Sequence, residues 1–451
     1  MSQSKGGVQS AWKGRWTFIL AATGSAVGLG NLWKFPYITG EYGGSAFVLA
    51  YLLCILIIGI PVMMSEIMLG RDGRRSPIKT MQTLTKKYSA PRFFTSMGWM
   101  GAVAGFLILS FYSVVAGWAL VYIGKMASGI FVEAGADTAA QVIGELHGSA
   151  WTQLAAHTVF MVMTGVVVAL GVHKGLERGI RFLMPTLFLM LIALFFYSMT
   201  TPGFGKSLTY LFGFTLEKIN GEALINALGH AFFTLSIGMG AIMAYGAYLP
   251  EKSHIGKTVL IAATLDTVIA LIAGVIIFSI VFSNGLPPTV GPSLLFESLP
   301  IAFGGLPGGV LIGTVFFLLV VVASWTSSIS IAEPAVAWAV DKGYSRKAST
   351  VVVCLVAWFL GIGTVLSFNH WAEVKFFGRT VFQNIDFLTA NIMMPLGGLM
   401  LAIFVGWFMS RDEIAQQMRI RSERVFSVWR FVLRYLSPLA ILAVFIHGLV
   451  G

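Results

Sequence analysis

Apolar stretches long enough to cross a lipid bilayer recur along the whole chain, and they limit its fold more than any other feature. A membrane-spanning helix needs about 20 mainly apolar residues. We count eleven such stretches, near residues 16–39, 44–70, 93–124, 154–171, 180–199, 223–248, 257–283, 309–340, 348–367, 385–409 and 430–449. Only 11% of the 451 residues are charged, against roughly 25% in soluble proteins. The sequence therefore predicts an all-α polytopic membrane protein, with residues 1–451 forming one transmembrane domain.

The basic residues are distributed unequally between the two sides of the predicted membrane. A net charge of +11 would suggest nucleic-acid binding in a soluble protein, but most Lys and Arg here fall in loops on the side of the N-terminus. The other side holds only Lys125, Lys206, Lys218, Lys375 and Arg379. Cytoplasmic loops are enriched in this way. We expect no nucleic-acid partner but a multi-pass protein of the inner or plasma membrane, with a cytoplasmic N-terminus and an extracytoplasmic C-terminus. Specific binding of anionic lipid is the lesser alternative.

Two of the spans are interrupted by glycines at corresponding positions in two sets of five. The first span contains GSAVGLGN at 24–31, and the sixth contains TLSIGMGA at 234–241. Paired interruptions of this kind point to an inverted-repeat transporter with a central binding site. Irregular backbone at membrane depth persists only where it lines a cavity or is buried in protein. Close helix packing through small residues is the alternative, and it explains either stretch alone equally well.

Longer motifs around these interruptions resemble one known family. GSAVGLGNLWKFPY, GGSAFVLAY, GIPVMMSEIMLGR, FFTLSIGMGA and ASWTSSIS are similar to motifs of the neurotransmitter:sodium symporter family, in its short prokaryotic branch. The similarity extends from about Trp12 to the tenth span, near residue 410. It implies the leucine-transporter fold: two inverted five-helix repeats, about 12–200 and 222–410, plus one additional C-terminal helix, about 424–449.

The resemblance implies two sodium sites, and the first has a plausible chemical basis in the sequence. Hard cations prefer oxygen ligands. The stretch ASWTSS places a carbonyl and two hydroxyls at helical spacings of three and four, on one face. An isolated Ser or Thr would more often bond back to its own helix. By resemblance, the ligands are the carbonyls of Gly24, Val27 and Ala323 and the hydroxyls of Thr326 and Ser327.

The second implied sodium site contains a departure from the family pattern. Its ligands by resemblance are the Ala26 carbonyl, the Asn31 side chain, Thr234 and position 266, which is Asp266 here and often asparagine in the family. A carboxylate at mid-bilayer costs at least about 2.5 kcal/mol and needs a cation. Many members of the family also require chloride, and Asp266 could supply that negative charge instead. We therefore expect chloride-independent uptake; a protonated Asp266 that only bonds neighbouring helices is the alternative, with a proton-coupled role between the two.

The implied substrate is a neutral, mostly hydrophobic L-amino acid. N–H groups near Leu29 and Gly30, together with the Tyr112 hydroxyl, would hold its carboxylate. Monoamine-transporting members carry aspartate at the position of Gly28, so glycine there favours an amino acid over an amine. Individually, Ile108 or Met239 would be ordinary helix packing. The residues implied to bind substrate are Ser25, Ala26, Leu29, Gly30, Ile108, Tyr112, Phe233, Thr234, Ser236, Met239, Ser327 and Ile331.

The resemblance also implies an external gate. Lys34 and Asp386 would form its charged pair, and Phe233 would cover the substrate. The family often has arginine at position 34. Lysine keeps the charge but loses the bidentate fork, so the gate could be looser.

On the cytoplasmic side, Asp341 matches the gate aspartate of the family, whose usual arginine partner lies three residues before the tryptophan that matches Trp12. The usual arginine partner falls at Gln9, which departs from the pattern. Lys5, Lys13 or Arg15 could replace that arginine, or the inner gate could be weak.

Two further features bear on conformational change. Gly175 and Pro185 enclose nine residues at the start of the fifth span, a spacing found in some bacterial relatives, where unwinding lets water reach the sodium site at Ser327. An ordinary proline kink explains it equally well. Glu66 is expected to be a structural hydrogen-bonding group, and Glu333 could line the cytoplasmic pathway.

Together these features predict a sodium-coupled symporter that works by alternating access. Proton-coupled transport of amino acids or amines, and a substrate sensor that does not transport, are the alternatives on the same fold. An intramembrane enzyme is disfavoured because the sequence lacks HExxH and GxSxG motifs, and because His157, His230 and His447 are scattered. The sequence predicts no oligomeric state.

Overall fold

The computed structural model describes residue 12 and residues 14–213, 220–289, 291–420 and 422–450. Its main elements are α-helices joined by short loops, with several π-helical or 3-10 segments, labelled η. In chain order they are α1 (Arg15–Ala26), η1 (Gly30–Lys34), α2 (Phe35–Glu41), α3 (Ser45–Cys54), η2 (Ile55–Gly59), α4 (Ile60–Gly73), α5 (Pro77–Lys87), η3 (Arg92–Phe94), α6 (Thr95–Ala127), α7 (Ala136–Gly148), α8 (Ala150–Ala169), η4 (Val172–Glu177), α9 (Arg178–Met199), α10 (Phe204–Phe212), α11 (Gly221–Thr234), α12 (Ala241–Ala247), α13 (Ile255–Ser283), η6 (Gly291–Leu294), α14 (Ser298–Gly304), α15 (Gly309–Asp341), α16 (Arg346–Leu366), α17 (Val381–Phe387), η7 (Leu388–Met393), α18 (Met394–Ile403), η8 (Phe404–Phe408), α19 (Arg411–Met418), α20 (Glu423–Phe431), η9 (Val432–Leu436) and α21 (Ser437–Val450).

The spans predicted from hydropathy are all present, and the two predicted to be broken are broken. Within the described residues, nine helices are long and apolar enough to cross a membrane. The first and sixth spans are not among the nine because each is divided. The helix α1 ends at Ala26 before η1 begins at Gly30, and α11 ends at Thr234 before α12 begins at Ala241. Nine continuous and two divided spans make the eleven expected.

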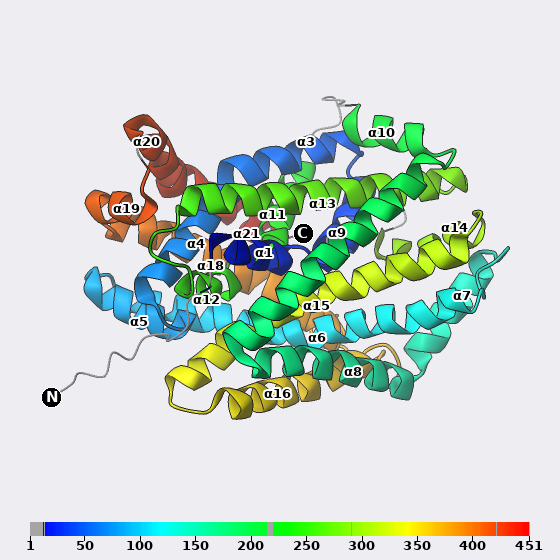
Figure 1. Cartoon of the computed structure of the whole chain (residues 1–451), viewed down its shortest axis with the longest axis horizontal. Helices are drawn as coiled ribbons and strands as arrows, with labels where there is room; N and C mark the ends of the chain where they lie inside the picture. The colour runs from blue at the N-terminus through cyan, green and yellow to red at the C-terminus, as the bar shows by residue number, and fades with distance from the viewer. Residues whose placement is uncertain (1–11, 13, 214–219, 290, 421, 451) are drawn as a thin grey trace.

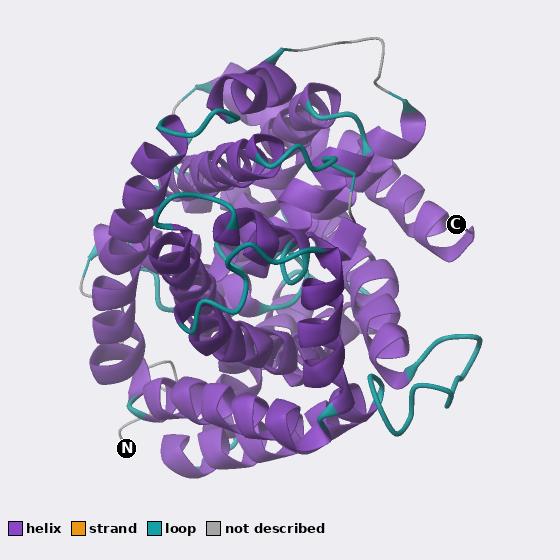
Figure 2. Ribbon diagram, turned by 90° about the vertical axis from the view of Figure 1, so that its right-hand side faces the viewer, coloured by secondary structure: helices purple, strands orange, loops and turns teal. Residues whose placement is uncertain are grey.

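The helices lie side by side and form a bundle around the two broken spans. In Figure 1 most helices run along the long axis of the molecule, with α5, α19 and α20 at one end and α7, α10 and α14 at the other. Seen end-on in Figure 2, they surround a central group of helices, and the C-terminal end lies at the periphery. The two longest helices, α6 and α15, pack against each other, and α15 also contacts α1 and α12. The C-terminal helix α21 packs on α18 and α11.

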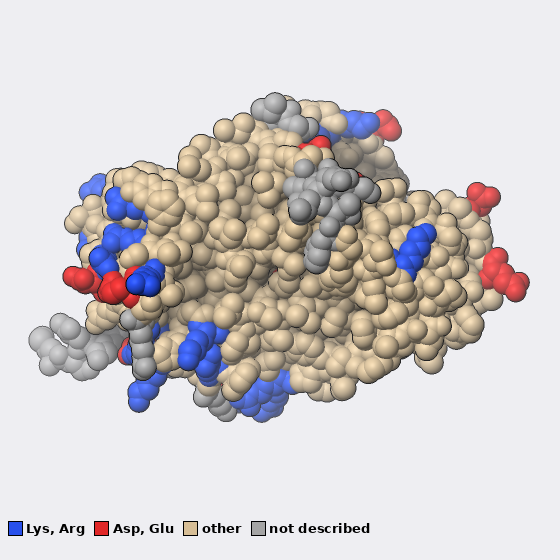
Figure 3. Space-filling view, turned by 90° about the horizontal axis from the view of Figure 1, so that it is seen from above, with Lys and Arg blue, Asp and Glu red and all other residues tan. Residues whose placement is uncertain are grey.

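Charged side chains are concentrated at the ends of this bundle. On the face shown in Figure 3, Lys and Arg gather at the end that carries α19 and α20, while the middle is almost free of charge. Such a band is what a bilayer requires, since charged groups at its centre are costly. The surface therefore agrees with a multi-pass membrane protein.

The start of the fifth span is helical in this structure and packs tightly. The π-helical segment η4 contains Gly175, and α9 follows with Pro185 inside it. A Cβ atom on Gly175 would lie 1.9 Å from the carbonyl oxygen of Val167, so only glycine fits here. The side chain of Met184, which precedes Pro185, packs against Gly24 of the first span, with its sulfur 3.0 Å from where a Cβ would stand. The roles expected for Gly175 and Pro185 in unwinding stay predictions.

Replacing Gly175 with alanine should destabilise the protein by about 1–3 kcal/mol, because the new methyl group would overlap the backbone of α8. Thermal unfolding of the purified protein in detergent measures this effect. Gly179→Ala is the matched control, since a Cβ there would meet only a methyl group of Val167, at 3.3 Å. Equal unfolding temperatures for the two variants would contradict the packing described.

Candidate functional site

The two helix breaks face each other and are fastened together by hydrogen bonds. At the first break Val27 is extended, with φ −74° and ψ 113°. At the second, Ser236 has a positive φ of 54°, which is uncommon for a residue with a side chain. Its hydroxyl donates to the carbonyl of Ser25 at 2.9 Å. The buried Glu66 accepts a hydrogen bond from the N–H of Gly238 at 3.0 Å, so this acid stabilises the break, as expected of a structural group.

Three of the five oxygens expected to bind the first sodium, those of Gly24, Val27 and Ser327, meet between α1 and α15. The Ser327 hydroxyl donates to the carbonyl of Val27 at 2.8 Å and lies 3.3 Å from that of Gly24. The Thr326 hydroxyl donates to the carbonyl of Ala323 at 2.9 Å. All five residues are buried. Carbonyl and hydroxyl oxygens without a nearby acid form a chemically suitable site for a monovalent hard cation.

Of the residues expected to bind the second sodium, Asn31 and Thr234 lie against Asp266 of α13, and Ala26 lines the central cavity. Asn31 Nδ2 donates to Asp266 Oδ1 at 2.8 Å, and the Thr234 hydroxyl lies 3.0 Å from Asp266 Oδ2. Asn31 Oδ1 accepts from the N–H of Gly28 at 3.1 Å. Asp266 is fully buried, and no described basic side chain forms an ion pair with it. A cation between these oxygens would balance its charge.

All but one of the residues expected to bind substrate line one small cavity between the breaks. Its volume is about 20 Å³, which is room for about one water molecule. Thr234 is the only residue of the expected set that does not line this cavity. Its hydroxyl contacts Asp266 of the expected second sodium site. The lining residues are Ser25, Ala26, Gly28, Leu29, Gly30, Ile108, Tyr112, Phe233, Ser236, Met239, Ser327 and Ile331.

Gly28 is the lining residue that our expected set lacked. A Cβ atom on it would lie 2.6 Å from the Tyr112 hydroxyl and 2.5 Å from that of Ser327. The Tyr112 oxygen also accepts a hydrogen bond from the N–H of Leu29 at 3.3 Å. Any side chain at Gly28 would therefore enter the space where a carboxylate could meet that N–H. The sequence does carry a signal for Gly28, because monoamine-transporting members have aspartate at this position. Its absence here is the basis for the expected substrate class.

A second cavity, of about 90 Å³, lies on the other side of Phe233 and Tyr112, which line both cavities. Lys34 and Asp386 line it too, but the structure does not join them in an ion pair. Lys34 Nζ instead lies 4.5 Å above the ring of Phe233. Both charged residues of the expected gate therefore line the same cavity, which we call the vestibule. Lys34 stacks on the ring of Phe233 and does not pair with Asp386.

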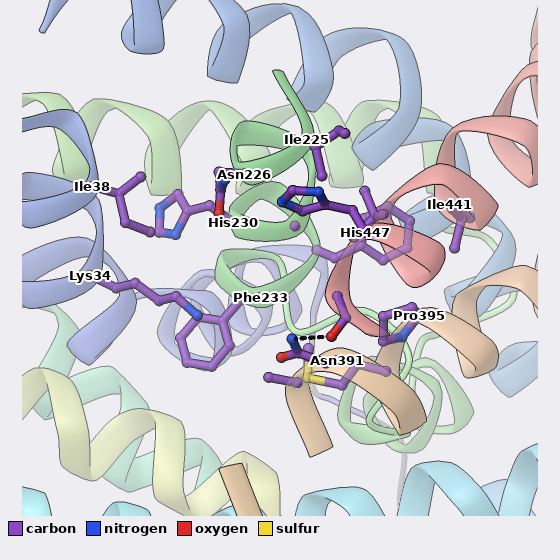
Figure 4. Close-up of a pocket in the computed structure, with 16 residues that line it drawn as sticks. Lys34, Ile38, Ile225, Asn226, His230, Phe233, Asn391, Pro395, Ile441 and His447 are labelled. Atoms are coloured by element: carbon purple, nitrogen blue, oxygen red, sulfur yellow. Dashed lines mark hydrogen bonds between the residues drawn. The ribbon is translucent and has the colours of Figure 1, made fainter. Parts of the chain in front are cut away.

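A third cavity, of about 130 Å³, lies behind Lys34 and Phe233 (Figure 4). The C-terminal helix α21 forms one of its walls, with Ile441 and His447 at the lining. Asn391 of η7 donates to the carbonyl of Gly448 at 3.2 Å. The additional helix therefore contacts the region of the expected gate, which the sequence did not indicate.

The opposite end of the molecule is closed by a polar network around Trp12. Its indole packs edge-on against Tyr245 and Tyr248, and its backbone N–H donates to the Tyr248 carbonyl at 3.0 Å. The Tyr248 hydroxyl donates to the fully buried Glu333 at 2.6 Å. Arg346 pairs with the same carboxylate. The sequence suggested that Glu333 lines the cytoplasmic pathway, but it did not indicate the partners of this acid. Arg346 contributed to the sequence analysis only as one of the basic residues of the cytoplasmic loops.

Asp341 lies at this end and accepts a hydrogen bond from the backbone N–H of Ser76 at 2.8 Å, before α5. Gln9, Lys5 and Lys13, which entered the expected inner gate, lie outside the described residues. Arg15 donates to the hydroxyl of Thr258 at 3.3 Å and makes no ion pair with Asp341. In the described part of the chain, the expected gate aspartate therefore contacts a helix N-terminus rather than a basic side chain.

Comparison with known proteins agrees with this architecture. The model of the sodium:neurotransmitter symporter family matches residues 9–130 and 139–451. The chain is 37% identical to the sodium-dependent transporter YhdH of Bacillus subtilis, with 97% of each chain covered. It is 32% identical to a sodium-dependent transporter of Haemophilus influenzae, with 98% of each covered.

A solved structure extends the similarity to three dimensions. The crystal structure of MhsT in complex with L-phenylalanine matches with a TM-score of 0.89 and 37% identity, covering 98% of this chain and 100% of that chain. The predicted all-α leucine-transporter fold is thereby confirmed, and these relatives are transporters rather than enzymes. The family model and both relatives cover nearly the whole chain, and the chain therefore belongs to the sodium:neurotransmitter symporter family.

Proposed function

We propose that this protein is a sodium-coupled symporter of neutral, mostly hydrophobic L-amino acids, that it binds two sodium ions and that it needs no chloride. The observation that carries the proposal is the convergence of buried oxygens from two helix breaks beside a small, largely apolar cavity. Uptake of a panel of labelled amino acids into proteoliposomes, driven by an inward sodium gradient, is the direct test.

The chemistry of the cavity supports an amino acid with an apolar side chain. Ile108, Met239 and Ile331 supply an apolar wall, and the peptide groups of the first break supply polar contacts at the other side. MhsT, the structural relative, was solved with L-phenylalanine. At about 20 Å³ the cavity must widen to admit any amino acid. Met239 can contribute, because its unbranched side chain repacks easily.

Asp266 supports both sodium coupling and independence from chloride. A fully buried carboxylate beside oxygen ligands favours a cation strongly. It also supplies a fixed negative charge, which can replace the charge that chloride contributes beside the sodium ions in other members of the family. Proton coupling is the rival, because a fully buried carboxyl group can also become neutral by binding a proton.

The closures on the two sides support alternating access. On one side Leu29, Tyr112 and Phe233 lie between the central cavity and the vestibule and line both. On the other, Trp12, Tyr248, Glu333 and Arg346 join the N-terminal segment to three other parts of the bundle. We assign the second side to the cytoplasm, and with it the N-terminus, from the concentration of Lys and Arg there. If one closure opens while the other stays shut, and the two then change roles, the cavity is exposed to each side in turn.

Replacing chloride with gluconate should leave sodium-driven uptake within about twofold of its original rate. Asp266→Asn should raise the sodium concentration for half-maximal uptake by at least about tenfold, which corresponds to roughly 1.4 kcal/mol of lost interaction. Asp412→Asn, at an exposed position of α19, is the control. A collapse of uptake without chloride would refute chloride independence. Uptake that ignores sodium but is abolished by a protonophore would favour the proton-coupled rival.

Gly28→Ala should weaken amino-acid binding by at least about tenfold, because the added methyl group would overlap the Tyr112 hydroxyl. Binding of labelled L-phenylalanine to the purified protein at saturating sodium measures this change. Gly229→Ala is the control, since a Cβ there would stand 3.7 Å from Val444. Unchanged binding by the Gly28 variant would mean that the carboxylate is held elsewhere.

Tyr248→Phe should loosen the cytoplasmic closure, because one hydrogen bond to the buried Glu333 is lost and such bonds to charged groups are worth about 1.5–3 kcal/mol. Hydrogen exchange should then become faster in α1, while α7 at the far end stays unchanged. Tyr344→Phe, at an exposed position, provides the comparison. Equal rates of hydrogen exchange in α1 for the two variants would show that the Tyr248 hydroxyl does not hold this side closed.

A further inference from the structure

Three arginines surround an open pocket at the start of the C-terminal span. The pocket has a volume of about 200 Å³ and is bordered by Arg411 of α19, Arg430 of α20 and Arg434 of η9. None of these residues lines the central cavity or belongs to the expected sodium sites. The chain thus brings three guanidinium groups together at a place that the proposed transport cycle does not use.

Positive charge in this pocket is only partly balanced by the described residues. Arg411 forms an ion pair with Glu423. No described acid pairs with Arg430 or Arg434, and the buried Nε atoms of both lack a hydrogen-bond partner. Arg430 and Arg434 are four residues apart, a spacing at which like charges destabilise a helix. An anionic ligand with several oxygens would relieve both costs.

Aromatic side chains hold the guanidinium of Arg434 in place. It lies 4.1 Å from the ring centroid of Trp407, and the Trp407 indole N–H donates to the Arg434 carbonyl at 3.2 Å. The ring of Tyr435 lies 5.6 Å from it. Trp407 and Tyr435 are 51% and 44% exposed. Exposed Trp and Tyr are typical of the membrane–water interface, so they indicate the depth at which these arginines lie.

The position in the membrane determines which anion fits. The helix Glu423–Leu449 has only 17% of its apolar window buried in the protein, so lipid surrounds most of it. No Asp, Glu, Lys or Arg follows Arg434 in the sequence, so the arginines stand where the apolar part begins. This end of the molecule also carries most of the Lys and Arg visible in Figure 3. Lipid phosphates lie at the same level, and arginine binds phosphate bidentately.

We propose that Arg411, Arg430 and Arg434 form a binding site for the phosphate-bearing headgroup of an anionic glycerophospholipid in the cytoplasmic leaflet. Trp407 and Tyr435 position the guanidinium of Arg434 and cover the glycerol region of the lipid. The acyl chains lie along the exposed face of α21. Free phosphate shares the headgroup chemistry but lacks these apolar contacts, so it binds far more weakly.

The test is lipid retention by the purified full-length protein, measured by native mass spectrometry during titration with phosphatidylglycerol or phosphatidylcholine. We expect the wild type to retain phosphatidylglycerol preferentially. The double variant Arg430→Gln/Arg434→Gln should bind it about 30-fold more weakly, at about fivefold for each arginine near the surface. Arg424→Gln is the control, because Arg424 is exposed on the same helix and does not border the pocket.

Several results would overturn the proposal. These are equal retention of the two lipids by the wild type, equal weakening by Arg424→Gln, or competition by millimolar inorganic phosphate that removes the lipid completely. The variant Arg430→Lys/Arg434→Lys keeps the charge and tests the site even if the glutamine variant does not fold. It should fall between the wild type and the glutamine variant, and wild-type affinity in it would rule out bidentate recognition.

Discussion

The structure depends on the way peptide groups freed from two membrane helices find new partners. In a bilayer a peptide group without a hydrogen bond costs several kcal/mol, so a broken span is stable only if its neighbours replace the lost bonds. Here Ser236 bonds the carbonyl of Ser25, Glu66 bonds the N–H of Gly238, and Ser327 bonds the carbonyl of Val27. Each break is held partly by the other and partly by α4 or α15. The oxygens proposed to bind sodium are part of this same set of bonds.

The two ends of the bundle are closed by different kinds of interaction. Around the vestibule, the cover is an aromatic ring with a lysine stacked on it, and moving this ring breaks a cation–π contact but no ion pair between described residues. At the other end, Glu333 is completely buried and depends on Arg346 and Tyr248. Separating a buried carboxylate from its partners is costly unless water or another cation replaces them. Opening this end therefore requires a larger rearrangement than opening the vestibule.

Much of this arrangement could be predicted from the sequence, because membrane helices restrict which residues are tolerated. Glycines and polar residues inside apolar spans indicated both breaks, and the carboxylate of Asp266 in the middle of its span suggested a cation site. What could not be predicted depends on distances between segments far apart in the chain. Lys34 was expected beside Asp386 but lies on Phe233. Gly175 was interpreted through flexibility, whereas in this structure it allows contact with Val167. The size of the central cavity and the wall formed by α21 likewise had no sequence signal.

The hydrogen bond from Leu29 to the Tyr112 hydroxyl has a consequence for the unloaded protein. In its absence, an N–H group inside the membrane would have no acceptor whenever substrate is missing, and the empty form would be penalised relative to the loaded one. Because the Tyr112 hydroxyl already accepts this hydrogen bond, a substrate carboxylate bound here as proposed would replace the tyrosine as the acceptor of the Leu29 N–H. It would not supply an acceptor to a donor that had none. In the proposed transport cycle, this contact therefore reduces the difference in free energy between the protein with and without substrate, and the return of the empty protein becomes easier.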